Sequence, residues 1–279
     1  MQATKNYVDH RLSLGEAPST VNRRLATLKH FGRTLAERVH GFINPAREVK
    51  GPSMQASRPH GLSTEEIDLL RTVAAAEVSK NGESFIPRRN QFLLELLFAT
   101  GLRADEVRLL VAAQLEEKLE WLKNVRTKGR KFRNVYVESS VRPLFEEYLE
   151  ARCCELIKRH PGFFELPEKA RGRFPVIIST YGAEISKPSS YGLAPKSIWR
   201  VIANFGKLAQ ASSTSKITNL HPHKLRHTFA HGLLDSSKDV RLVAQALGHS
   251  DVRTTMRYTE RSDEQLAKAI EKKNTIESK

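Results

Sequence analysis

The chain has 279 residues, which is enough for one large domain or for a small domain beside a medium one. Its 46 lysines and arginines against 31 acidic residues leave a net charge of +15, which favours DNA, RNA or anionic lipid as a partner. A general surplus for solubility is the alternative explanation. No stretch approaches the ~18 consecutive apolar residues of a membrane span, and the first residues lack the apolar core of a secretory signal. We therefore expect a cytoplasmic protein without membrane association.

The cysteines and the glycine-rich loop motifs limit which metal and cofactor sites the sequence can form. The two cysteines, Cys153 and Cys154, are adjacent in sequence, so neither a disulfide nor a thiolate zinc site is expected from them. The sequence contains neither a G-x-x-x-x-G-K-[ST] loop nor a G-x-G-x-x-G fingerprint. The sequence thus predicts no metal and no nucleotide cofactor.

The amino-terminal region, residues 1–50, is predicted to be a short, basic helical domain. Positions 1–60 carry ten basic and four acidic residues, a local net charge of 10 − 4 = +6. A helix is expected from Ser19 and Thr20, which are good capping residues. Its apolar face would consist of Val21, Leu25, Leu28, Phe31 and Leu35. Its polar face offers Arg23, Arg24, Lys29 and Arg33 as candidate DNA contacts.

A Pro- and Gly-rich stretch over 44–61 predicts a linker, placed at 51–61, before a larger domain over 62–279. Ser63 and Glu66 have capping-box spacing for the first helix of that domain. Helices are expected at 64–78, 87–99, 104–113, 140–159 and 194–209, and through 222–273 with breaks near 235–238 and 248. A β-hairpin is expected over 119–138 and a short strand at 176–179. The fold class is therefore mainly α with a small antiparallel sheet, an α+β protein.

Arg103 is the first candidate functional residue, in A-T-G-L-R-A-D-E. Gly101 can end one helix in a left-handed cap, and Asp105 and Glu106 suit the first turn of the next. An arginine at such a junction can point into a cleft. Taken alone, a surface arginine explains the position as well.

The motif H-P-H-K-L-R-H-T-F-A-H places His223 and Arg226 three residues apart, hence on one face of a helix. Leu225, Phe229 and Leu233 are expected to face the core, whereas His227 and His231 are interpreted as structural donors. A guanidinium binds two phosphate oxygens at once. Together with Arg103, Arg226 could neutralise a phosphodiester in its transition state.

The motif L-G-H-S-D-V-R-T-T-M-R-Y-T places His249 after a helix-ending glycine and Tyr258 nine residues later. Packing is the alternative role for any of the six tyrosines. Tyr258, however, has Thr254, Thr255, Arg257 and Thr259 as neighbours, which indicate a polar helix with an isolated phenol. A phenol with a pKa of ~10 becomes a nucleophile only beside cationic donors and a proton acceptor.

Lys128 lies at the expected hairpin tip, in T-K-G-R-K, where a lysine could protonate a leaving 5′ oxygen. A solvated lysine that contacts the DNA backbone is the alternative. Arg130 and Lys131 compete for the same role and are further candidate DNA contacts.

The ordered set of motifs resembles the tyrosine recombinases, which include phage integrases and bacterial chromosome-dimer resolvases. The resemblance rests on A-T-G-L-R, T-K-G-R-K-F-R-N-V-Y-V, H-x-L-R-H-T-F-A and L-G-H-S-x-x-x-T-T-x-x-Y-T, and covers about 62–260. The separations, 249 − 226 = 23 and 258 − 249 = 9, are similar to the family's.

This resemblance implies a catalytic domain that follows a short core-binding domain and recombines specific DNA sites without metal or ATP. The tyrosine at 258 would form a 3′-phosphotyrosine bond, and the 5′ hydroxyl of the partner strand would reverse that step. Glu106 would orient its neighbours. The catalytic set that it implies is Arg103, Lys128, His223, Arg226, His249 and Tyr258.

The resemblance also implies partners. It suggests a double-stranded recombination site, association with the nucleoid, accessory DNA-bending proteins, and a homotetramer joined by a C-terminal helix. Residues 264–273, with Leu266 and Ile270 on one face, fit that helix; a solvated tail helix is the alternative.

Two other functions stay open at this point. A type IB topoisomerase shares the Arg, Lys, His and Tyr chemistry, but the H-K-L-R-H and L-G-H-S spacing and the compact size favour a recombinase. A non-catalytic DNA-binding protein derived from an integrase would bind DNA without a covalent adduct. The amino-terminal region of about 45–60 residues is shorter than the helical bundle usual in the family, which bears on DNA binding more than on the chemistry.

Overall fold

The computed structural model describes residues 1–53, 61–127, 129, 131–181, 184, 186–212 and 217–248. The chain divides into two compact units, Met1–Ser57 and Arg58–Lys279. Between residues 1 and 248, no described helix is both long and apolar enough to cross a membrane.

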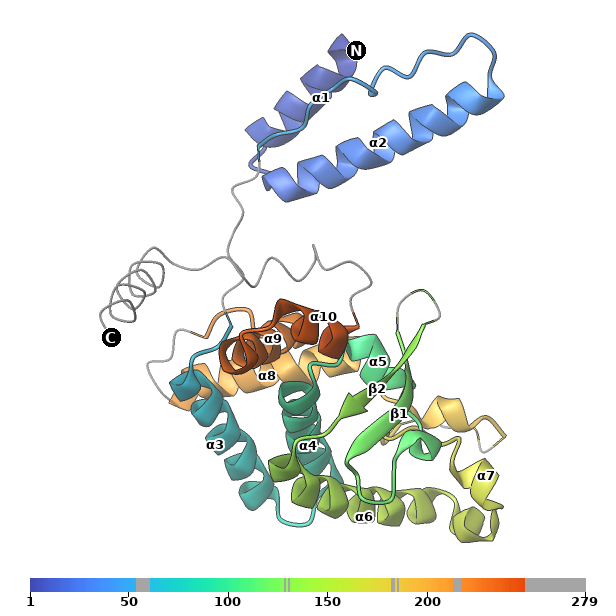
Figure 1. The fold of residues 1–279 in the computed structure, drawn as a ribbon, viewed down its shortest axis with the longest axis vertical. Coiled ribbons are helices and arrows are strands. Elements are labelled where there is room, and N and C mark those ends of the chain that lie inside the picture. Colours follow the sequence, from blue (N-terminus) through green and yellow to red (C-terminus); the bar gives the residue numbers. More distant parts are fainter. Residues whose placement is uncertain are drawn as a thin grey trace, which may run out of the picture. The chain divides into compact units, whose positions relative to one another are not determined.

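The first unit consists of α1 (Gln2–Ser13) and α2 (Pro18–Arg38), joined by a short turn (Figure 1). Helix α2 begins after Ala17, with Pro18 in its first turn, so the predicted capping by Ser19 and Thr20 is wrong. Proline starts a helix well because its fixed φ suits the first turn and its missing N–H is not needed there. The helix α1, which was not expected, packs beside α2.

The predicted apolar stripe on α2 is only half correct. Val21 and Leu25 are buried, and they form a small core with Val8 of α1 and with two residues of the returning segment, Ala46 and Val49. Leu28 and Phe31, in contrast, are exposed. Helix α1 has 12 residues and α2 has 21, so α1 covers only part of the apolar stripe of α2.

The second unit is mainly helical and contains a two-stranded antiparallel sheet, as the sequence predicts. Its helices are α3 (Thr64–Asn81), α4 (Phe85–Thr100), α5 (Ala104–Leu109), α6 (Arg142–Arg159), α7 (Glu168–Arg171), α8 (Pro195–Ser212), α9 (Pro222–Ser237) and α10 (Val240–Leu247). Helix α4 is central, because it packs against α3, α6 and α9 and is buried without interruption from Phe92 to Thr100. Ser63 and Glu66 form the predicted capping box of α3.

The predicted hairpin consists of β1 (Trp121–Arg126) and β2 (Phe132–Tyr136). The register pairs Trp121 with Tyr136 and Val125 with Arg133, with an irregularity between residues 122 and 125. At that point Asn124 has a positive φ of 52°, and its N–H donates to Asn134 Oδ1 at 3.0 Å. Such a bulge bends the strand and aims the hairpin tip.

Two sequence predictions fail together around residues 110 and 176. The helix expected over 104–113 ends at Leu109, and residues 176–179 form no strand. Instead, the two segments meet through single bridges: Val176 N–H donates to Leu110 O at 2.8 Å and Ala112 N–H donates to Phe174 O at 3.0 Å. The Ile177 carbonyl accepts from the Leu193 N–H at 3.1 Å. The carbonyls of residues 175, 176, 178 and 179 accept from side chains, three of them from arginines, so the segment is extended without a ladder.

Candidate active site

The α4–α5 turn places Arg103 at the start of α5. Gly101 ends α4 in the left-handed region, with φ 59° and ψ 23°, as its position predicts. A Cβ atom at Gly101 would lie 2.4 Å from the ring of Phe229 on α9, so the turn needs glycine for space as well as for conformation. The N–H of Arg103 donates to Glu106 Oε2 at 2.9 Å, which fixes the first turn of α5.

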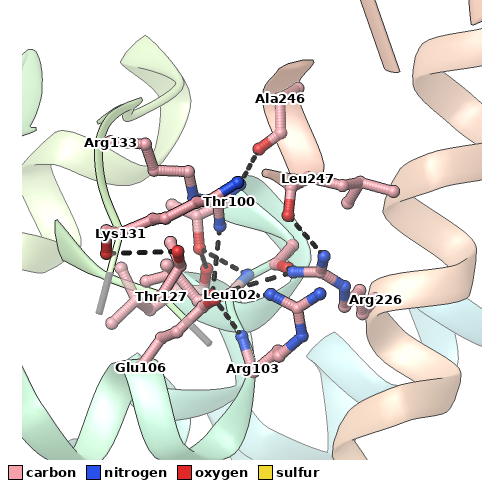
Figure 2. A network of polar contacts seen from close by, with 12 residues as sticks. Thr100, Leu102, Arg103, Glu106, Thr127, Lys131, Arg133, Arg226, Ala246 and Leu247 are labelled. Carbon is pink, nitrogen blue, oxygen red and sulfur yellow. Dashed lines mark hydrogen bonds and ion pairs between the residues drawn. The ribbon is translucent and has the colours of Figure 1, made fainter. Parts of the chain in front are cut away.

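Glu106 is the centre of a buried cluster of arginines (Figure 2). Its carboxylate contacts Arg103 Nη1 at 2.7 Å, Arg133 Nη2 at 3.1 Å and Arg226 Nη1 at 3.7 Å. Only 3% of the Glu106 side chain is exposed. The orienting role predicted for Glu106 therefore has a structural basis, since three elements, α5, β2 and α9, meet at one carboxylate.

Arg226 is the most buried guanidinium of this cluster, with 4% of its side chain exposed. Its Nη1 donates to Gly101 O and its Nη2 to Leu247 O, both at 2.6 Å. Arg226 thus ties the α4–α5 turn to the last residue of α10. Three guanidinium groups around one carboxylate leave an excess charge of about +2, which suits a phosphate diester.

Arg133 belongs to the cluster, although our sequence analysis did not select it. It donates from β2 to Glu106 and, through Nη1, to the carbonyl of Ala246 in α10 (Figure 2). Burial lowers the pKa of Arg133, an effect that the Glu106 carboxylate opposes. A sequence signal existed: Arg133 alternates in step with Val135 and Val137, which are both buried, so period two predicts an inward-pointing side chain.

His223 is exposed on the first turn of α9. Partial desolvation, and then the charges of Arg226 and Arg103, lower the pKa of His223, which favours the neutral form of its imidazole. Trp199 of α8 stacks on His221, with ring centres 5.2 Å apart, and meets His223 edge-on at 6.1 Å. A neutral, partly fixed imidazole beside two guanidinium groups can exchange a proton with a hydroxyl.

The other predicted site residues fall into two groups. Lys128, Arg130, His249 and Tyr258 lie outside the described residues, as does the helix expected at 264–273. Lys131 is exposed on the hairpin, and its carbonyl accepts from Thr127 N–H at 2.7 Å, which closes the hairpin loop.

The candidate DNA contacts on α2 differ in their surroundings. Arg23, Arg24 and Arg33 are all exposed; Arg24 forms an ion pair with Glu16 at 3.1 Å, and Arg33 Nη2 lies 3.0 Å from His30 Nδ1. Lys29 and Arg33 line a groove of the first unit together with His30 and Arg47. Among the residues that the structure describes, no three His, Cys, Asp or Glu side chains gather as a metal site requires.

Comparisons with known proteins show the family to which the chain belongs. Residues 62–265 match the model of the phage integrase family. The tyrosine recombinase XerC of Staphylococcus haemolyticus is 29% identical over 264 residues, covering 95% of this chain and 78% of the relative. The tyrosine recombinase XerD of Staphylococcus epidermidis is 26% identical over 267 residues, covering 96% and 80%.

Solved structures show the same fold. The XerA recombinase aligns with a TM-score of 0.55 at 22% identity, covering 96% of this chain and 80% of that one. The Tn1549 transposon integrase in complex with a circular intermediate DNA aligns with a TM-score of 0.66 at 14% identity, covering 97% and 84%. The mainly helical domain with its hairpin therefore has the fold of these recombinase structures. The chain belongs to the phage integrase family, and it is a tyrosine-type site-specific recombinase.

Proposed function

We propose that Arg103 and Arg226, two arginines of the cluster around Glu106, bind the scissile phosphate of a DNA recombination site and that Tyr258 attacks it. The observation that carries this proposal is the convergence of Arg103, Arg133 and Arg226 on one buried carboxylate. The excess positive charge is held in place before substrate arrives, and this preorganisation is what stabilises charge that develops in a transition state.

In the reaction that we propose, each phosphate ester bond that breaks is replaced by a new one. The Tyr258 oxygen attacks phosphorus and loses its proton to a neutral imidazole, for which His223 and His249 are candidates. The 5′ oxygen leaves with a proton from Lys128, and the product is a 3′-phosphotyrosyl ester with a free 5′ hydroxyl. A 5′ hydroxyl of the partner strand then attacks the ester, restores the diester and releases the tyrosine, so no external energy source is needed.

Binding of duplex DNA is proposed to involve both parts of the chain. We assign residues 1–50 to a core-binding domain, 51–61 to a linker and 62–279 to the catalytic domain. The exposed Arg23, Arg24 and Arg33, the groove residue Lys29, and the hairpin residues Arg130 and Lys131 are proposed to contact backbone phosphates. Phosphate contacts of this kind position the protein on DNA and make binding sensitive to salt.

Assembly is a further part of the proposal. A homotetramer, joined through residues 264–273, would bring two duplexes together for strand exchange, with accessory bending proteins where the site requires them. Association with the nucleoid follows from binding to chromosomal DNA.

Covalent trapping tests the proposal. Nicked duplex fragments from the neighbourhood of the gene are incubated with the protein in a metal chelator and denatured, with Tyr258→Phe as the matched control. We expect a denaturation-resistant adduct with the wild type and none with the variant. Binding of the fragments by both proteins without any adduct would contradict the proposal and favour non-catalytic DNA binding. Relaxation of supercoiled DNA without recombinant products would favour topoisomerase activity.

A further inference from the structure

Arg133 connects three parts of the catalytic unit. It lies on β2 and pairs in register with Val125 of β1. Its side chain is 10% exposed. Its guanidinium donates to Glu106 of α5 and to the Ala246 carbonyl of α10, residues that are 27 and 113 positions away in the sequence. A planar guanidinium can satisfy two such acceptors at once, which an ammonium cannot do with the same geometry.

The end of α10 is built around this side chain. Gly248 caps α10 in the left-handed region, with φ 63°. A Cβ atom at Gly248 would lie 3.0 Å from Cδ of Arg133, so glycine lets the chain pass close over the arginine. Arg226 donates to the adjacent carbonyl, that of Leu247. Two arginines from different elements therefore hold successive carbonyls at the point from which the chain continues to His249.

We propose that Arg133 is a positioning residue of the active site. It holds Glu106, and through that carboxylate the guanidinium groups of Arg103 and Arg226, and it anchors the last turn of α10 to the hairpin that carries Lys128. Arg133 itself does not touch the reacting atoms in this account. The inference rests on the proposed function, because it assigns a role within the site that binds the scissile phosphate.

If Arg133 acts by positioning the phosphate-binding arginines, its loss should affect a charged phosphodiester and an uncharged analogue differently. A methylphosphonate at the scissile position replaces one non-bridging oxygen by a methyl group, so the linkage has no negative charge to be neutralised. Loss of correctly placed guanidinium groups should therefore slow cleavage of the phosphodiester more than cleavage of the methylphosphonate. A general loss of folded protein would slow both to the same extent.

The test measures the rate of adduct formation in single turnover, at saturating protein, on nicked substrates of both kinds. Each rate is expressed relative to the wild type on the same substrate. For Arg133→Gln we expect about a 100-fold loss on the phosphodiester, the size expected for misplacing catalytic groups by about 1 Å. On the methylphosphonate we expect a loss of about 10-fold or less, since the guanidinium charge matters less there.

Arg142→Gln is the matched control. Arg142 braces the other end of the same hairpin through the Val137 carbonyl, the Tyr136 hydroxyl and Glu120, and makes no contact with Glu106. We expect its rates to stay within about threefold of the wild type on both substrates. If Arg133→Gln does not fold, Arg133→Lys is the second variant, because it keeps the positive charge but cannot donate to two acceptors in the same geometry. We expect its rate to fall more on the phosphodiester than on the methylphosphonate, with a smaller loss than for Arg133→Gln.

The outcomes separate the two proposals. Equal losses on the two substrates, or no loss for the folded Arg133 variants, would overturn the positioning role while adduct formation by the wild type still supports the proposed function. If the wild type forms no adduct on the phosphodiester, the proposed function fails and the positioning role fails with it.

Discussion

The described part of the second unit contains two sets of arginines with buried partners, and they differ in what they bind. Around Glu106, the guanidinium groups of Arg103, Arg133 and Arg226 share one carboxylate. Around the extended segment 174–179, Arg89 donates to the Ile178 carbonyl at 3.2 Å, and Arg152 donates to the Pro175 carbonyl at 2.8 Å. Arg89 and Arg152 are as buried as Arg226, with 6% of each residue exposed.

The arginines of the second set donate to carbonyls that a neighbouring β-strand would bind in a sheet. The carbonyls of residues 174–179 have no sheet partner apart from single bridges, so arginine side chains and the Tyr148 hydroxyl, which donates to the Val176 carbonyl at 2.8 Å, satisfy them. Burial lowers the pKa values of Arg89 and Arg152. The guanidinium groups of Arg89 and Arg152 donate to backbone carbonyls. The arginines around Glu106 instead bring several positive charges close to one carboxylate. Burial of an arginine alone therefore does not indicate a phosphate site, and our proposal of such a site rests on the convergence of arginines on a shared acid.

The largest effect is expected for Glu106→Gln, which keeps the shape of the side chain and removes its charge. Three guanidinium groups would then repel one another without compensation. We expect a loss of about 3–5 kcal/mol in the free energy of unfolding, the range for breaking a buried ion pair. Urea unfolding at pH 7 measures this loss. Inorganic phosphate should stabilise the variant more than the wild type, because the anion can replace the missing charge.

Glu95→Gln is the matched control for that variant. Glu95 is also a nearly buried carboxylate, but among the described residues its ion pair is with a single arginine, Arg71, whose side chain is 47% exposed. A freed Arg71 can turn to solvent, so we expect a loss of only about 1–2 kcal/mol and no extra response to phosphate. Equal losses for the two variants would show that the shared acid at Glu106 has no special importance.

A smaller effect is expected for Arg152→Met, which fills most of the volume and leaves the Pro175 carbonyl without its donor. The loss in the free energy of unfolding should be about 1–3 kcal/mol, the range for an unsatisfied buried acceptor. Adduct formation per folded molecule should not change. A fall in that normalised rate would assign Arg152 to the site and would remove the distinction between the two sets.

The smallest effect concerns pH. Burial, and then the charges of neighbouring histidines, lower the pKa of His227 from 6.5 to about 4. Between those values the unfolded chain binds more protons than the folded one, so stability rises with pH from about 4 to 6.5 and is constant above. Because His227 is only half-buried, we expect a contribution of about 1 kcal/mol, which His227→Asn should remove from the pH profile of urea unfolding. An unchanged profile in the variant would contradict this assignment.

Local sequence patterns predicted much of this architecture. The capping box at Ser63, the left-handed glycines at 101 and 248 and the alternation in the hairpin each depend on a few neighbouring residues. Arg103 and Arg226 could be selected because each stands in a short motif. The structure brings them together on Glu106, and their catalytic roles stay predictions, as do those of Lys128, His249 and Tyr258, which lie outside the described residues.

Contacts between residues that are far apart in the sequence could not be predicted from local patterns. The alternation in the hairpin indicates that Arg133 points inward, but it does not indicate that the guanidinium contacts Glu106 and Ala246. Arg89 and Arg152 bind carbonyls, and a carbonyl has no sequence signature. The apolar run at 176–179 has strand composition, but composition cannot reveal that arginines take the place of a neighbouring strand.

The most direct test compares Arg226→Lys with Arg152→Lys, two equally conservative changes of equally buried arginines in the two sets. Adduct formation in single turnover is measured on the nicked substrate and normalised to folded, DNA-bound protein. Our account predicts a loss of about 100-fold or more for Arg226→Lys, because one ammonium cannot replace the fork at the phosphate. For Arg152→Lys it predicts an unchanged normalised rate with lower stability. Similar normalised rates for the two variants would contradict the claim that the arginines gathered at Glu106 form the phosphate site.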